Sequence, residues 1–269
     1  MTGHRRFFIE QGAIVGDSAV ITGDVARQIE RVLRLKNGDS ICLVDGRGTE
    51  FDAEITALSG GAVSARILGS RRCDADPLVR LMLAICLPKG DKIDFIVQKC
   101  TELGVSELIV VSSERTVARI PDEKVSSRLA RWRKIAKEAA EQCGRAAAPG
   151  VEGILRISDL AELASTVPVA LLACESGDPP PLRRVLREGF RHDGSADETG
   201  ACPLPERGSS DLGSVMIIVG PEGGLSETEI RLLVDAGAVP VSLGRRILRC
   251  ETAAVAACAA VMYELEGEL

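Results

Sequence analysis

The chain has 269 residues, of which 45% are hydrophobic, and a formal net charge of −6. This composition excludes an intrinsically disordered chain and is sufficient for two domains with substantial cores. Nine cysteines without any CxxC pair, and no apolar signal segment at the start, predict a cytoplasmic protein and disfavour structural zinc or any other metal.

The first part of the chain predicts a small β-rich module. A helix is expected from Asp24, its N-cap, with one apolar face. That face holds Val25, Ile29, Val32 and Leu33. Alternating apolar residues separated by glycine turns then predict a meander of strands. These strands are expected at residues 41–44, 51–55 and 63–67.

A polar run at residues 71–77 marks a predicted domain boundary, which gives domains at 1–73 and 74–269. In the second domain, short apolar runs alternate with helical periodicity, as is typical of an α/β fold with buried strands. Strands are expected at 78–87, 108–111, 167–174, 215–219 and 239–243, and helices from Asp91, after Pro121, from Ser226 and near Glu251. Residues 189–213 show no periodicity and predict a flexible insertion.

Two glycine-containing loops near the C-terminus each join a predicted strand to a predicted helix. The first is Gly220-Pro221-Glu222-Gly223-Gly224, followed by a capping box of Ser226 and Glu229. The second is Leu243-Gly244-Arg245-Arg246-Ile247-Leu248-Arg249, and it leads into an alanine-rich helix. That helix contains the longest apolar stretch, residues 253–263, which is too short to span a bilayer, so no membrane partner is expected. Glycines in both loops let a ligand approach bare backbone N–H and C=O groups.

These two segments closely resemble those of the trefoil-knotted SPOUT methyltransferases. More specifically, they resemble the family that methylates N3 of a uridine in small-subunit (16S) ribosomal RNA. The resemblance spans nearly the whole chain and departs from the family pattern at 189–213, where the family is usually shorter. Its other motifs are Arg5-Arg6-Phe7-Phe8, residues 32–39, Lys89-Gly90-Asp91-Lys92, residues 98–104, Ser113-Glu114-Arg115 and residues 141–145.

The resemblance implies the fold, the cofactor and the assembly. The fold would be α/β, with a C-terminal trefoil-knotted SPOUT methyltransferase domain preceded by a small β-barrel PUA-like domain that binds RNA. The cofactor would be S-adenosyl-L-methionine, held between three loops, and the protein would be a homodimer. The implied cofactor-binding residues are Leu172, Ala173, Cys174, Gly220, Glu222, Gly223, Leu243, Gly244, Ile247, Leu248, Thr252 and Ala253.

Arg249 and Glu251 are the catalytic candidates. The planar guanidinium of Arg249, expected to be buried, suits the donor carboxylate, a phosphate or the uracil carbonyls, and a structural ion pair with Glu251 is the alternative. Glu251 and Glu222 are the carboxylates available to accept the N3 proton, although Glu251 also suits a helix N-terminus and Glu222 a turn. Positioning alone supplies roughly 7–11 kcal/mol in well-oriented reactions, so only modest help with the proton is needed.

Local basic patches, rather than the total charge, predict contacts with ribosomal RNA of the small subunit or its assembly particle. Residues 1–72 contain ten Lys/Arg against nine Asp/Glu. Basic residues one helical turn apart also fit an ordinary solvated face, which is the alternative interpretation. The RNA-binding candidates are Arg5, Arg6, Arg31, Arg34, Lys89, Lys92, Arg115 and Arg145.

Two other functions are compatible with these motifs. One is a SPOUT methyltransferase that acts on another RNA or another atom, such as a ribose 2′-hydroxyl. The other is a non-catalytic RNA-binding factor for ribosome assembly with a degenerate pocket. The intact glycines of both loops argue against the second.

Overall fold

The computed structural model describes residues 5–10, 12–118, 120–189 and 213–266. Most of the predicted insertion at 189–213 therefore lies outside the described residues. The chain forms two compact units, Met1–Asp76 with Lys137–Ala148, and Pro77–Ala136 with Pro149–Leu269. The first unit thus includes a segment from the middle of the chain, which the sequence did not indicate.

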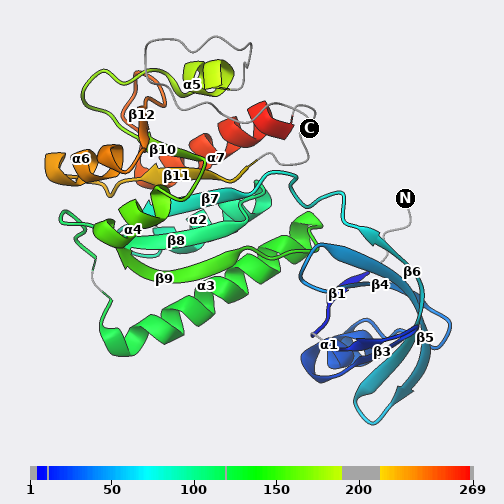
Figure 1. Ribbon diagram of the computed structural model, residues 1–269. Helices are drawn as coiled ribbons and strands as arrows, with labels where there is room; N and C mark the ends of the chain where they lie inside the picture. Colours follow the sequence, from blue (N-terminus) through cyan, green and yellow to red (C-terminus); the bar gives the residue numbers. More distant parts are fainter. Residues whose placement is uncertain (1–4, 11, 119, 190–212, 267–269) are drawn as a thin grey trace. The chain divides into compact units, whose positions relative to one another are not determined.

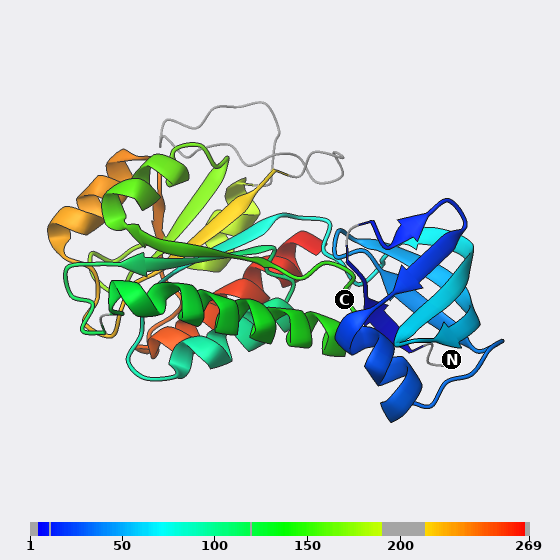
Figure 2. The same ribbon diagram turned by 90° about the horizontal axis from the view of Figure 1, so that it is seen from below.

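A curved six-stranded sheet forms the first unit (Figure 2). Its strands are β1 (Arg6–Phe8), β2 (Ile14–Val15), β3 (Ser18–Ile21), β4 (Ser40–Val44), β5 (Thr49–Ser59) and β6 (Ala62–Arg72). The strand order is β1-β4-β5-β6-β3-β2, with β1 parallel to β4 and all other neighbours antiparallel. The predicted meander is confirmed as β4, β5 and β6. Gly60 and Gly61, both with positive φ, make the tight turn between β5 and β6.

The helix of this unit differs from its predicted geometry. α1 (Gly23–Arg27) has Thr22 as its N-cap, and it continues into the π-helical turn η1 (Gln28–Val32). The backbone N–H of Leu33 donates to the carbonyl of Gln28, five residues earlier. Because a π-turn holds more residues than an α-turn, the periodicity slips, and Val32 is 73% exposed instead of facing the core. Ile29 remains fully buried.

The C-terminal turns of a long helix complete the core of the first unit. This helix, α3 (Asp122–Cys143), begins in the second unit, and Ala140 packs with Phe8, Cys42 and Val44. After it, Arg145 is buried, and its Nε donates to Oδ1 of Asp76 over 3.4 Å. The carboxylate of Asp76 also accepts from the backbone N–H groups of Ala146 and Ala147. Arg145, predicted to bind RNA, is therefore part of the interior of this unit.

Replacing Asp76 by alanine should destabilise the protein by about 3 kcal/mol, because it removes an acceptor from a buried guanidinium and two backbone amides. The midpoint of chemical denaturation measures this loss. Asp74→Ala is the matched control, since Asp74 is exposed and its removal should change the free energy of unfolding by less than about 0.5 kcal/mol. Equal midpoints for the two variants would show that the Asp76 cluster contributes no stability.

The second unit is built on a six-stranded sheet in which all neighbouring strands are parallel (Figure 1). Its strands are β7 (Leu81–Cys86), β8 (Glu107–Ser112), β9 (Gly150–Arg156), β10 (Val169–Ala173), β11 (Val215–Val219) and β12 (Val239–Val241). The order is β12-β10-β11-β7-β8-β9. The predicted strands are confirmed: β7, β10 and β12 are shorter than expected, β11 has the predicted bounds and β8 is longer, and β9 was not predicted. Leu78 lies before β7 and is 69% exposed.

Helices cover both faces of this sheet. They are α2 (Lys92–Glu102), the first part of α3, α4 (Ile157–Ala164), α5 (Leu182–Gly189), α6 (Glu227–Asp235) and α7 (Cys250–Glu266). Side chains of α2, α3, α5 and α7 pack on one face, whereas those of α4 and α6 pack on the other. Alternate residues of β7 belong to the two cores, so the strand is buried on both sides. None of the helices in the described part of the chain is long and apolar enough to cross a membrane.

Candidate active site

Three neighbouring strands of the second unit, β12, β10 and β11, end at the same edge of the sheet. Parallel strands place the loops after their carboxyl ends side by side, where open α/β sheets bind ligands. The loops that follow are residues 174–181 after β10, 220–226 after β11 and 242–249 after β12. Backbone hydrogen bonds join the first and third, from Leu182 to Ser242 and from Ser242 to Pro180.

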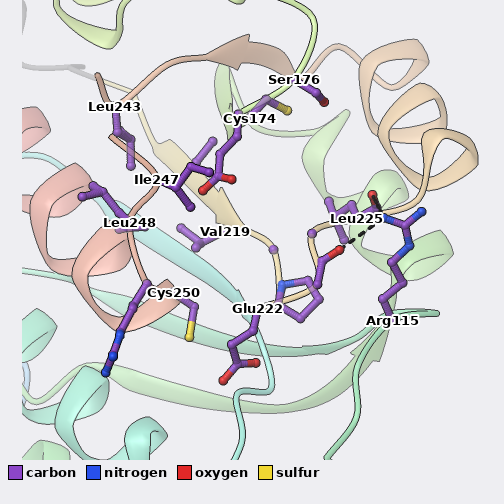
Figure 3. Close-up of a pocket in the computed structure, with 18 of the residues that line it drawn as sticks. Arg115, Cys174, Ser176, Val219, Glu222, Leu225, Leu243, Ile247, Leu248 and Cys250 are labelled. Carbon is purple, nitrogen blue, oxygen red and sulfur yellow. Dashed lines mark hydrogen bonds between the residues drawn. The ribbon is translucent and has the colours of Figure 1, made fainter. Parts of the chain in front are cut away.

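These loops enclose a cavity of about 580 Å³ (Figure 3). Val219, Leu243, Ile247 and Leu248 give it apolar walls, whereas Glu175, Ser176 and Glu222 are polar. Of the predicted cofactor residues, all except Leu172 and Thr252 line this cavity. Leu172 is fully buried in the core below it, and Thr252 is exposed on the first turn of α7.

Glycines shape the cavity through backbone geometry. Gly244 has φ +124° and Gly224 has φ +68°, both in the region that favours glycine. A Cβ on Gly220 would lie 3.3 Å from Cγ and 3.4 Å from the backbone nitrogen of Leu225, so a side chain there would force Leu225 to shift by a few tenths of an ångström. The predicted capping box follows and is confirmed, with Glu229 donating its backbone N–H to Oγ of Ser226 and accepting the backbone N–H of Ser226.

Arg115 holds the glycine loop after β11 in place. It lies in the loop after β8, and its Nη1 donates to the carbonyl oxygens of Gly223 at 3.2 Å and Leu225 at 3.4 Å. The neighbouring backbone N–H of Glu114 donates to Oε1 of Glu229 at 2.7 Å. A loop from one strand therefore fixes the ligand loop of another. No local sequence pattern indicated this contact, since the two residues bonded to Arg115 lie more than a hundred positions away along the chain.

Replacing Arg115 by methionine should weaken cofactor binding about fivefold, because loss of a hydrogen bond worth about 1 kcal/mol loosens the glycine loop. Isothermal titration of the variant with S-adenosylmethionine measures this change. Glu114→Ala is the control, since it keeps the backbone N–H that bonds Glu229 and should bind normally. Normal cofactor affinity with weaker RNA binding in Arg115→Met would instead favour the RNA-contact role predicted from the sequence.

Lys92 joins Glu222, which lines the cavity, to Glu251, which does not. Its Nζ lies 2.9 Å from Oε1 of Glu222 and 3.3 Å from Oε2 of Glu251. The backbone N–H of Lys89 also donates to Glu222, and the thiol of Cys250 donates to Glu251. The alternative ion pair between Arg249 and Glu251 is therefore not formed. Lys92, one of the RNA-binding candidates, is engaged within the protein.

These contacts keep both carboxylates ionised. Burial raises the pKa of Glu222, but hydrogen bonds from Lys92 and from backbone amides more than offset this, so the pKa lies below its ordinary value. The pKa of Glu251 is likewise lowered, because its own backbone amide, Cys250 and Lys92 outweigh burial. Burial, followed by the hydrogen bond to Glu251, raises the pKa of the Cys250 thiol to about 12. Two ionised carboxylates of low pKa are weak proton acceptors at neutral pH.

Arg249 lines the cavity, but it is exposed rather than buried, which corrects the expectation from the sequence. Its backbone carbonyl accepts the N–H of Ala253 and so begins α7. Among the side chains that the structure describes, none forms a hydrogen bond or ion pair with its guanidinium. The group is free to meet a ligand.

The other RNA-binding candidates have different surroundings. Arg6 is bonded to Glu50 and to Sγ of Cys73 within the first unit. Arg5, Arg31, Arg34 and Lys89 are exposed, and Nη1 of Arg5 lies 3.4 Å from the carbonyl oxygen of Leu33. The exposed candidates stay predictions, whereas Arg6 and Arg145 have clear structural partners.

Comparison with known proteins identifies the class of this protein. Residues 75–262 match the family model described as an RNA methyltransferase domain, and residues 21–68 match the RNA methyltransferase PUA domain. Together the matches define an RNA methyltransferase in which an α/β domain follows a PUA-like domain. The predicted order of a PUA-like domain and an α/β methyltransferase domain is therefore confirmed, whereas the trefoil knot stays a prediction, and the three-loop cavity lies within the methyltransferase domain.

Similar proteins show to which family of RNA methyltransferases the chain belongs. The chain is 33% identical to Ribosomal RNA small subunit methyltransferase E of Bacillus subtilis, covering 97% of each chain. It is 30% identical to the protein of that name from Mycobacterium tuberculosis, covering 95% of this chain and 90% of the relative. A crystal structure of the Neisseria gonorrhoeae methyltransferase E bound to S-adenosyl methionine has 31% identity and a TM-score of 0.75, with 97% of each chain covered. The chain belongs to the ribosomal RNA small subunit methyltransferase E family.

The cavity of this chain fits S-adenosylmethionine. Cofactor sites are mostly apolar clefts of roughly 300–1,000 Å³ with a few polar groups, and about 580 Å³ lies in that range. An adenine ring needs apolar walls and backbone partners, and Val219, Leu243 and Leu248 line the cavity together with Gly220 and Gly244, of which Gly244 has open space where a Cβ would lie. The predicted cofactor thus agrees with the residues present.

Proposed function

We propose that this protein transfers a methyl group from S-adenosylmethionine to N3 of a uridine in small-subunit (16S) ribosomal RNA. The observation that carries the proposal is the glycine-bordered cavity at the carboxyl ends of β10, β11 and β12, in a member of the methyltransferase E family. The proposal includes action in the cytoplasm, a homodimer and the trefoil knot of SPOUT methyltransferases. Light scattering on the purified protein tests the dimer.

The cavity residues divide into walls and polar anchors. Val219, Leu243 and Leu248 would cover the adenine ring, and the backbone at Gly220 and Gly244 would supply its hydrogen-bond partners. Glu175 and Ser176 line the cavity on the loop after β10, where they suit the polar end of the cofactor. When bound, S-adenosylmethionine supplies a methyl group on a positively charged sulfur.

Methylation of uracil N3 would form a nitrogen–carbon bond, break the bond between the methyl carbon and the donor sulfur to leave S-adenosylhomocysteine, and release one proton from that nitrogen. Loss of this proton places negative charge on the neighbouring carbonyl oxygens of the base. The exposed guanidinium of Arg249, at the rim of the cavity, would stabilise that charge with two parallel N–H donors. Lys92 holds Glu251 ionised, and Glu251 would help to fix the position of the residues beside it. Solvent would receive the proton that leaves N3.

A methylation assay tests the proposal. The protein is incubated with S-adenosylmethionine that carries a labelled methyl group and with unmodified 16S ribosomal RNA, or with small subunits that contain this RNA. Label should appear in the RNA, and nuclease digestion should release it as 3-methyluridine. Label in a 2′-O-methyl nucleoside would favour the other methyltransferase reaction. Cofactor binding without transfer to either substrate would favour the assembly factor.

A further inference from the structure

The loop after β12 carries positive charge that has no role in the proposed contacts with the cofactor. This basic loop, residues 244–249, contains Arg245, Arg246 and Arg249, all exposed, in a chain whose net charge is −6. Arg246 and Arg249 line the cavity, whereas Arg245 does not. Between them Ile247 is 82% exposed, an unusual position for a large aliphatic side chain.

Neither Arg245 nor Arg246 is paired with a carboxylate among the residues that the structure describes. Other arginines of the chain do have such partners, since Arg71 pairs with Asp52 and Arg131 with Asp94. Exposed arginines in proteins often belong to a solvated face, but here two adjacent unpaired guanidinium groups lie beside a ligand cavity. The positive charge of this loop is therefore available to a partner.

The backbone of the basic loop is fixed at both ends. Oγ of Ser242 accepts the N–H of Gly244 and donates to its carbonyl oxygen, and the carbonyl of Arg249 accepts the first hydrogen bond of α7. Leu243 and Leu248 pack against the core below, while Ile247 extends beside Val219 in the cavity (Figure 3). A fixed loop presents its arginines at a lower cost in conformational entropy than a flexible one.

We infer that the basic loop binds the RNA backbone, with Arg245 and Arg246 contacting phosphates beside the nucleotide that enters the cavity. Ile247 would then cover the sugar or base next to it. The ligand chemistry follows from the charges: Glu175 lines the cavity and repels phosphate, whereas Lys92 offsets the charge of Glu222, so the backbone passes on the arginine side. This inference rests on the proposed function and adds an RNA contact outside the PUA-like domain.

The test compares two double variants that each remove two positive charges. Arg245→Ala/Arg246→Ala removes the proposed contacts, and Arg231→Ala/Lys124→Ala removes exposed charges of α6 and α3 that do not line the cavity. The affinity of each full-length variant for a fluorescent 16S ribosomal RNA transcript is measured over a series of KCl concentrations. Titration with S-adenosylmethionine on the same preparations reports whether the cavity is intact.

We expect the basic-loop variant to bind RNA about tenfold more weakly at low salt. The slope of log affinity against log salt should fall by about 1.5, because each phosphate contact contributes roughly 0.7–0.9. Its cofactor affinity should fall by a much smaller factor than its RNA affinity, because only Arg246 of the two lines the cavity. RNA affinity and salt slope equal to those of the control would overturn the inference, as would a loss of cofactor affinity that matches the loss for RNA.

Failure of the proposed function has a different signature. If the wild-type protein bound the transcript and the cofactor but methylated no ribosomal RNA, the proposed reaction would be wrong. The comparison of the two double variants would still decide whether the basic loop binds RNA.

Discussion

Replacement of Gly244 by valine should weaken the binding of S-adenosylmethionine by more than about tenfold. Gly244 has φ +124°, which a β-branched residue adopts only at a cost of about 1–3 kcal/mol, and it lines the cavity beside Leu243. The loop is expected to relieve this strain by moving, and its movement would disturb the apolar wall. Isothermal titration with the cofactor measures the effect.

Gly237→Val is the matched control. Gly237 follows α6, has φ +96° and, like Gly244, has no atom within 4 Å of an added Cβ, but it does not line the cavity. Both variants should therefore lose stability, and only Gly244→Val should lose cofactor affinity. A similar drop in melting temperature for both, with normal cofactor affinity in both, would show that the loop after β12 does not contact the cofactor.

Replacement of Arg249 by lysine should lower the rate of methyl transfer about a hundredfold, even though positive charge is kept. Lysine lacks the planar pair of N–H donors, and loss of one preorganised donor to a developing negative charge typically costs that much. Single-turnover methylation at saturating RNA and cofactor measures the rate. Stability should not change, because Arg249 is exposed and Glu251 pairs with Lys92 instead.

Arg231→Lys is the control for this variant, since Arg231 is exposed on α6 away from the cavity and its replacement should leave the rate unchanged. Normal transfer by Arg249→Lys would remove Arg249 from the catalytic group. A lower melting temperature with normal transfer would return it to the structural role considered from the sequence.

Features that depend on neighbouring residues in the chain were predictable. The capping box of Ser226 and Glu229 needs only residues three positions apart, and its hydrogen bonds form as expected. The glycine loops were recognisable because each follows a short apolar strand, whereas the cofactor candidates on them came from the family resemblance, and most of these candidates line the cavity. β9 was not predicted, because Gly150 and Gly153 interrupt its alternation of apolar and polar residues. The helix that follows it, α4, was not predicted either.

Features that depend on distant residues were not predictable. Arg145 was predicted to contact RNA, but in the structure its side chain is bonded to Asp76, which lies 69 positions earlier in the chain. Arg115 was also predicted to contact RNA, although its guanidinium donates a hydrogen bond to the loop after β11. The exposure of Val32 has a local cause, the π-turn that contains it. A π-turn has no sequence pattern comparable to the periodicity of an α-helix, so the shift of Val32 away from the core could not be predicted.

Nucleoside mass spectrometry of 16S ribosomal RNA from cells that lack this protein shows directly whether it methylates uridine N3. We expect that one 3-methyluridine present in the parent strain is missing, and that the wild-type chain restores it while Arg249→Lys restores little. An unchanged content of 3-methyluridine in the deletion strain would show that this protein does not make the modification.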